Sequence, residues 1–199
     1  MNTAFLASVI VLCVGVFWGV YWVPVRAIAA LGLDGAWGTG AITLAAMLFL
    51  LPFVAGKTHL VRDTGLVGVV SITLGGAAFA LYSIGFLYGK VALVVLLWFF
   101  SPVWSVLIAK FILRWQVPKL RLVAIGVGLA GLFIMLGGEG SVPVPRSLGE
   151  WMAFIGGLIW AGATAGMRLK SRVPPLPAAF VFALGATPLG FKFEARQLI

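Results

Sequence analysis

Long apolar runs separated by short basic loops dominate this chain and most constrain its fold. The first run covers residues 5–31, and similar runs follow at 37–55, 65–88, 91–113, 121–137 and 149–168. A helix needs about 20 apolar residues to cross the hydrocarbon core of a bilayer, so each run predicts a membrane-spanning helix. A seventh run, at about 177–190, is short for a span because charged residues follow it. We therefore expect an all-α, polytopic membrane helix bundle with six to seven spans.

The charged residues support this class and indicate an orientation. Only 10% of the residues are charged, against about 25% in soluble domains. With the N-terminus in the cytoplasm, the inside loops hold eight bases and the outside loops two. Because Lys and Arg accumulate in cytoplasmic loops, this predicts a multi-pass inner-membrane protein with a cytoplasmic N-terminus. The inside bases are Lys57, Arg62, Arg114, Lys119, Arg121, Arg168, Lys170 and Arg172, and the outside bases are Lys90 and Arg146.

The sequence argues against several other functions. The net charge of +9 comes from scattered bases that form no contiguous face, so we expect no nucleic-acid partner. Cys13 and His59 are the only cysteine and histidine, so we expect no metal site. No paired acids, Ser/His/Asp set or phosphate-binding loop is present, so we expect neither an enzyme nor a cofactor.

A short similarity between two parts of the chain predicts an internal repeat. The stretch "WGVYWVPVR" (residues 18–26) and the stretch "WAGATAGMR" (residues 160–168) each place a tryptophan eight residues before an arginine. Five predicted helices lie within the offset between the two stretches. Because an odd number of helices separates them, the second copy enters the membrane from the opposite side. Inverted-topology repeats are typical of secondary transporters. We therefore expect residues 1–140 to be a first five-helix repeat and residues 149–199 the incomplete start of a second.

Several motifs together resemble the EamA-type branch of the drug/metabolite transporter superfamily. They are "FWGVYWVPVRAI", "ALYSIGFLYGKVALVVLLWFFSPVWSVLIAKF", "RLVAIGVGLAGLFIMLGG" and "GEWMAFIGGLIWAGATAGMRLKSR", within residues 5–172. The resemblance implies ten helices in two inverted repeats, with export or exchange of small organic metabolites by alternating access. Two departures concern the usual polar contact of the second helix and the usual acidic partner of the cytoplasmic bases. The chain reads "GTGAITLAAM" where members often carry an arginine early in the second helix, and "ILRWQVPKL" where they often carry a Gly-Glu pair.

The predicted helix 91–113 offers the best face for a solute cavity. Trp98, Ser101 and Ser105 are spaced i, i+3, i+7 and so share one stripe. Pro102 lacks a backbone N–H and can kink the helix there. Tyr82, on the preceding helix, is a further candidate. Trp98, Ser101 and Tyr82 can line a cavity or pack between helices.

Two candidates lie in the first predicted helix. Trp18 either packs over Gly19 or lines the cavity. Arg26 lies about five residues from the outer end of its helix, where its side chain can snorkel to the membrane surface. Alternatively, Arg26 holds an anionic group of the substrate, with Pro24 loosening the helix nearby. Substrate binding is thus predicted at Trp18, Arg26, Tyr82, Trp98, Ser101 and Ser105.

The leading hypothesis is a transporter of small organic metabolites in a lipid bilayer. All five acids, Asp34, Asp63, Glu139, Glu150 and Glu194, fall in loops or at helix ends, so exchange or facilitated transport fits better than proton coupling. The alternative is a truncated, non-transporting protein, or a half that needs a homodimeric or separate partner. The small-residue face of the predicted helix 121–137 predicts close packing by another helix; its members are Gly126, Gly128, Ala130 and Gly131.

Overall fold

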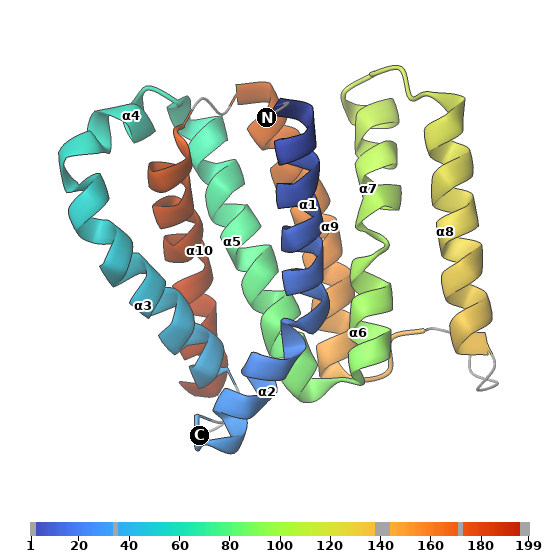
Figure 1. Ribbon diagram of the computed structural model, residues 1–199, viewed down its shortest axis with the longest axis horizontal. Helices are drawn as coiled ribbons and strands as arrows, with labels where there is room; N and C mark the ends of the chain where they lie inside the picture. The colour runs from blue at the N-terminus through green and yellow to red at the C-terminus, as the bar shows by residue number, and fades with distance from the viewer. Residues whose placement is uncertain (1–2, 34–35, 138–143, 171–172, 196–199) are drawn as a thin grey trace.

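The computed structural model describes residues 3–33, 36–137, 144–170 and 173–195 as an all-helical bundle. Successive long segments alternate in direction (Figure 1). One end, here called the α4 end, carries the start of α1, helix α4 and the loop between α7 and α8. The opposite end, the α2 end, carries α2 and the connection between α5 and α6. The elements are α1 (Thr3–Val20), α2 (Trp22–Ala30), α3 (Trp37–Val54), η1 (Ala55–Lys57), α4 (Thr58–Arg62), α5 (Gly65–Tyr88), α6 (Val91–Trp98), α7 (Ser101–Leu107), η2 (Ile108–Ile112), α8 (Lys119–Gly137), α9 (Leu148–Lys170) and α10 (Pro175–Ala195).

Five segments of the described chain are long and apolar enough to cross a membrane. They confirm a polytopic membrane helix bundle. Helices α8 and α10, with 19 and 21 residues, are of comparable length. The segments that meet both criteria are Phe5–Ala30, Trp37–Arg62, Gly65–Tyr88, Val91–Ile112 and Leu148–Leu169.

The expected first helix is interrupted at Tyr21, between α1 and α2. Proline has no N–H, and its ring clashes with the carbonyl four residues earlier, so Pro24 disfavours a continuous helix through residue 20. The Tyr21 N–H instead donates to the Trp18 carbonyl, at 3.4 Å, in a tighter turn. The prediction of one continuous helix was wrong here, although its bounds were nearly right.

The expected helix 91–113 is also interrupted. Helix α6 ends at Trp98 and α7 begins at Ser101, just before Pro102, where a kink was expected. Further along, the chain widens into the π-helical turn η2, in which the Leu113 N–H donates to the Ile108 carbonyl at 3.0 Å. Arg114 ends this turn with a φ of 54°, a left-handed conformation often found after the last helical residue.

Helix α10 is longer than the expected 177–190. It starts at Pro175, and a proline is well tolerated in the first turn of a helix. It continues past Gly190 to Ala195, with the exposed Lys192 in its last turn. A cation there interacts favourably with the helix dipole, so the end of the apolar run does not end the helix. Residues 58–62, expected to be loop, form α4.

Helix α5 lies at the centre of the bundle. It packs most extensively against α9, and α10 packs against both α5 and α3. Glycines permit the close crossing of α5 and α10: a Cβ on Gly76 would collide with the backbone carbonyl of Phe182. Small residues at such crossings let helix backbones approach closely inside a membrane.

The small-residue face of α8 behaves differently from expectation. No atom of the described chain outside α8 lies within 4 Å of a Cβ built on Gly126, Gly128 or Gly131. The face predicted to pack against another helix therefore has no helix against it here.

A buried polar network joins the α1–α2 break to the bundle. The hydroxyls of Tyr21 and Ser83 are 3.2 Å apart, and those of Thr39 and Ser83 are 2.9 Å apart. A similar contact joins α3 to α10, with 3.2 Å between the hydroxyls of Thr43 and Thr187. Hydroxyl groups inside a bilayer have no water to bond to, so bonds of this kind hold neighbouring helices together.

Candidate functional site

A cavity lined largely by aromatic side chains lies between α1, α5, α6 and α9. Its volume is about 470 Å³, within the range of about 300–1,000 Å³ typical of small-molecule sites. We call it the aromatic cavity. No lining residue carries a charge; the lining residues are Gly15, Trp18, Gly19, Trp22, Phe79, Tyr82, Phe86, Val95, Trp98, Phe99 and Trp160.

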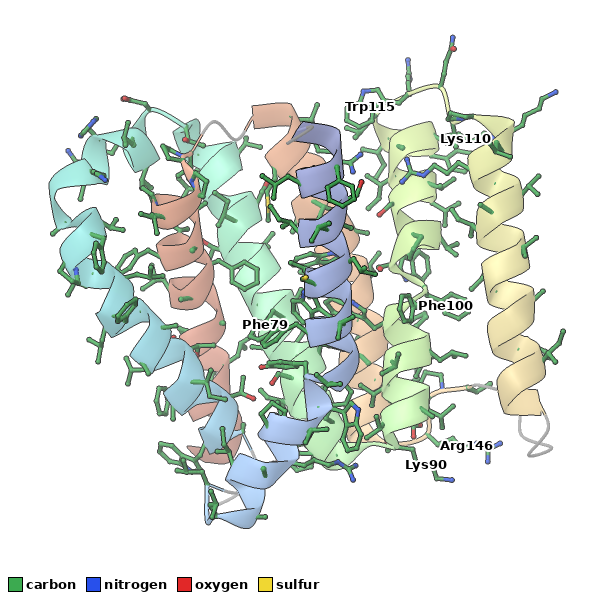
Figure 2. All side chains as sticks on the ribbon, viewed as in Figure 1. Phe79, Lys90, Phe100, Lys110, Trp115 and Arg146 are labelled. Atoms are coloured by element: carbon green, nitrogen blue, oxygen red, sulfur yellow. The ribbon has the colours of Figure 1, made fainter. Side chains whose placement is uncertain are left out.

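The aromatic rings around the cavity form a series in which each ring contacts the next. The ring centroids of Tyr82 and Trp98 are 4.5 Å apart, and those of Trp98 and Trp160 are 5.7 Å apart. On the side of α1, Trp18 meets Phe79 edge-on at 5.8 Å. These separations lie within the favourable range of aromatic pairs, so each ring restrains the next. Figure 2 shows Phe79 midway along the helices. From there the cavity extends to Phe86, near the α2 end of α5.

The break at Tyr21 positions the α1 wall of the aromatic cavity. The Tyr21 side chain is 8% exposed, and its hydroxyl is bound to Ser83 of α5. Its ring lies 5.5 Å from that of Trp18 and 5.6 Å from that of Phe79. The buried tyrosine thus fixes the end of α1 against α5 and places Trp18 over the cavity.

The structure brings together three of the six predicted site residues. Trp18, Tyr82 and Trp98 all line the aromatic cavity. Ser105 lies toward the α4 end and lines a separate small cavity. Ser101, the first residue of α7, is not among the residues that line these two cavities. The break after Trp98 separates the serines from the tryptophan, so the expected continuous stripe does not form.

Arg26 lies outside the aromatic cavity but next to it. Its Nη2 donates to the carbonyl of Phe86 at 3.2 Å, and Phe86 lines the aromatic cavity. The exposed Arg26 side chain also lines an open pocket of about 580 Å³ at the α2 end. Lys90 and Arg146, labelled in Figure 2, line the same pocket. Arg26 therefore lies where an anion approaching the aromatic cavity from the α2 end would meet it.

Glu150, the acid in this pocket, is held by the start of α9. Its carboxylate accepts the backbone N–H groups of Arg146 and Ser147, at 2.7 and 3.1 Å. In return, the Ser147 hydroxyl accepts the Glu150 N–H at 3.3 Å. This reciprocal pair is a capping box, and the sequence "SLGE" carries its signature. Glu150 is buried, with 3% of the residue exposed, and these bonds give its carboxylate a structural role.

Ser147→Ala should destabilise the protein by about 1 kcal/mol, because it removes the hydroxyl that caps α9. Thermal unfolding in detergent should show a lower midpoint, by roughly 2–4 °C for a chain of this size. Ser147→Thr, which keeps a capping hydroxyl, is the matched control. Equal midpoints for the two variants would show that the cap contributes nothing.

Sequence reasoning missed much of the cavity lining. Phe79 and Phe86 flank Tyr82 at i−3 and i+4 on α5, a spacing that places all three on one face. Trp160 was recognised as the repeat partner of Trp18, and both tryptophans line the same cavity. Their helices, α1 and α9, run in opposite directions in Figure 1. This is the arrangement that the predicted inverted repeat requires, although the repeat itself stays a prediction.

Among the described residues, no three His, Cys, Asp or Glu side chains gather where they could hold a metal ion. Asp34 and Glu139, two of the five acids, lie outside the described residues, as does Arg172. Asp63 directly follows α4, away from the aromatic cavity. The aromatic cavity therefore offers mainly aromatic surfaces, and no acidic residue is among its lining residues.

Comparison with known proteins gives one finding. A model of the EamA-like transporter family matches residues 5–137, which cover two thirds of the chain and the region from α1 to α8. No curated protein and no solved structure matches the chain.

Proposed function

The chain belongs to the EamA-like transporter family, and from this premise we propose that it carries small organic solutes through the aromatic cavity. The family and the apolar helices make it a multi-pass membrane protein. The observation that carries the proposal is the cavity itself. It is large enough for a small metabolite, and helices distant in sequence build it.

The lining indicates how a solute is held. Aromatic faces bind apolar or aromatic bodies, and the Tyr82 hydroxyl and the indole N–H groups can orient a polar substituent. No cavity-lining residue can neutralise a charged group, but Arg26 lies beside the cavity through its bond to Phe86. The proposed solute therefore has an apolar or aromatic body in the cavity and an anionic group at Arg26.

Alternating access moves such a solute between the two ends, as an exporter or an exchanger. None of the cavity-lining residues is acidic, and the carboxylate of Glu150 caps a helix. These facts support exchange or facilitated transport over proton coupling. The bases of α4 and of the start of α8 lie at the α4 end, and by the positive-inside rule this supports a cytoplasmic position for this end and for the N-terminus. The proposed location is the inner membrane of the cell.

Arg26→Gln tests the proposed function and the role of the arginine together. Proteoliposomes containing the full chain would be loaded with 3-phenylpropionate, and exchange of the labelled compound would be measured. Wild type should give saturable flux. Hydrogen bonds to a charged group are worth about 1.5–3 kcal/mol, so Arg26→Gln should raise KM by about tenfold or more. Arg26→Lys keeps the charge but not the planar guanidinium, and should fall in between.

Arg62→Gln is the control, because it makes the same change at an exposed arginine of α4. The neutral analogue 3-phenylpropanol should show no dependence on Arg26. Wild-type kinetics in both Arg26 variants would mean that the side chain only snorkels. A wild-type chain without saturable flux of any aromatic or aliphatic organic anion would contradict the transport proposal itself.

A further inference from the structure

Two cavities of the bundle meet at one residue, Arg121. The first, at the α4 end, has a volume of about 50 Å³ and is lined by Ser105, Ala109, Leu113, Trp115, Arg121, Ala161, Thr164, Ala165 and Arg168. The second is an apolar groove of about 260 Å³ between α7 and α8, lined by Phe99, Pro102, Arg121, Ala124, Ile125, Gly128 and Leu129. We call them the basic pocket and the groove.

The basic pocket has the chemistry of an oxyanion site. Arg121 and Arg168 come from different helices, α8 and α9, and line the same small space. Neither the basic pocket nor the groove has an acidic residue in its lining within the described chain. Ser105 and Thr164 belong to the same lining, and the Thr164 hydroxyl donates to the Trp160 carbonyl of its own helix. Guanidinium groups bind phosphate with two parallel hydrogen bonds, so a phosphate group matches this pocket.

The basic pocket also lies at the level of the membrane surface. Trp115, labelled in Figure 2, lines it at the α4 end, close to the labelled Lys110. The Trp115 side chain is 41% exposed. Tryptophan is enriched at the boundary between headgroups and hydrocarbon, where lipid phosphates lie.

The groove continues from the basic pocket into the hydrophobic part of the bundle. Its α8 residues, 121, 124, 125, 128 and 129, follow one face of the helix. They extend over nine residues, a rise of about 12 Å. Phe99 and Pro102, which form its far wall, lie at the break between α6 and α7. Apart from Arg121, every groove residue is apolar.

We propose that the basic pocket and the groove together bind one anionic phospholipid, with its phosphate at Arg121 and Arg168 and an acyl chain between α7 and α8. The shared residue Arg121 joins a phosphate site to an apolar track, and a phospholipid has the same two parts in the same order. The groove is too small for another helix, whose diameter with side chains is about 10–12 Å. Basic pockets between spans on the cytoplasmic side are known to bind lipid headgroups.

The headgroup half of the proposal is tested by binding of dioleoylphosphatidylglycerol to the full chain, counted as lipid adducts by native mass spectrometry. Arg121→Gln and Arg168→Gln should each lower the apparent affinity by about fivefold, the effect of one base near a charged lipid surface. Arg62→Gln, at an exposed position of α4, should leave the affinity unchanged. Dioleoylphosphatidylcholine should bind more weakly to wild type and should not distinguish the variants.

The acyl-chain half is tested by filling the groove. Gly128 lines the groove and Gly126 does not, and neither has any atom of the described chain outside α8 within 4 Å of its Cβ position. Gly128→Leu should therefore fold and should weaken binding of dioleoylphosphatidylglycerol, whereas Gly126→Leu should not. Dihexanoylphosphatidylglycerol, whose chains are too short to follow the groove, should bind Gly128→Leu as it binds wild type.

Three results would overturn the proposal. If inorganic phosphate competes fully with the lipid and Gly128→Leu has no effect, the site binds a free anion. If the arginine variants bind the lipid as the Arg62→Gln control does, the basic pocket is not the headgroup site. If wild type is a dimer and only Gly128→Leu makes it monomeric, a second copy of the chain covers the groove.

Discussion

Gly76→Val should prevent α5 and α10 from packing as they do in the native bundle. A Cβ at this position would overlap the carbonyl of Phe182 and lie 3.0 Å from the backbone nitrogen of Ala186. Backbone atoms cannot move aside as a flexible side chain can, so the two helices must separate. Overpacking costs up to about 3 kcal/mol when the structure can relax, and we expect at least this loss. The unfolding midpoint should then fall by roughly 6–12 °C.

Gly126→Val is the matched control, because it changes the same residue type in a long helix. No atom of the described chain outside α8 lies within 4 Å of that Cβ position. The intrinsic effect of valine on a helix is similar in both variants, so the difference between their unfolding midpoints reports the helix crossing. Equal midpoints would mean that α5 and α10 do not cross closely at Gly76.

Trp98→Ala should abolish most of the transport that we propose. Its ring lies between those of Tyr82 and Trp160, and each aromatic pair is worth about 0.5–1.5 kcal/mol beyond the burial of its area. Removing the ring opens the cavity and releases both neighbours. We expect a fall of about tenfold or more in kcat/KM for 3-phenylpropionate, measured in proteoliposomes with equal amounts of inserted protein.

Trp98→Phe should retain part of the activity, because it keeps an aromatic face at the same place. Trp151→Ala is the control, since Trp151 is 47% exposed on α9 and is not among the residues lining the aromatic cavity. If Trp151→Ala reduces kcat/KM as much as Trp98→Ala, the loss reflects general damage to the bundle and not the cavity.

The helices were predictable from the sequence because the bilayer imposes their length. Residues 65–88 form α5 with the bounds expected, and the expected helix 37–55 ends one residue earlier, at Val54. The two helix breaks were less predictable. Pro24 and Pro102 signalled weak points, but the breaks occur at Tyr21 and at residues 99–100. Their positions depend on packing and on contacts such as the one between Tyr21 and Ser83, which join residues distant in sequence.

The candidate site was only partly predictable, for a different reason. Lipid tails and a cavity lined by rings are both apolar. The hydrophobicity of a residue therefore does not show whether its side chain faces the lipid or the cavity. Trp18, Tyr82 and Trp98 were selected by residue type, whereas Phe79 and Phe86 resembled ordinary membrane-facing residues. Ser101 and Ser105 were selected by their helical spacing from Trp98. Because the helix is interrupted after Trp98, that spacing no longer places the three side chains on one face. The cap formed by Ser147 and Glu150 had a readable signature.

Helix α1 differs from α5 in how much it depends on the rest of the protein. In the most apolar window of the span Phe5–Ala30, which contains most of α1, 6% of the residues are buried inside the protein. In the corresponding window of α5 the share is 56%. Lipid can solvate α1 without any protein neighbour, whereas the glycine-rich surface of α5 is completed only when α9 and α10 are present. During synthesis α1 emerges before its partners, so it can reside in the bilayer alone. Its attachment through Tyr21 requires α5, because the Tyr21 hydroxyl is bound to the Ser83 hydroxyl.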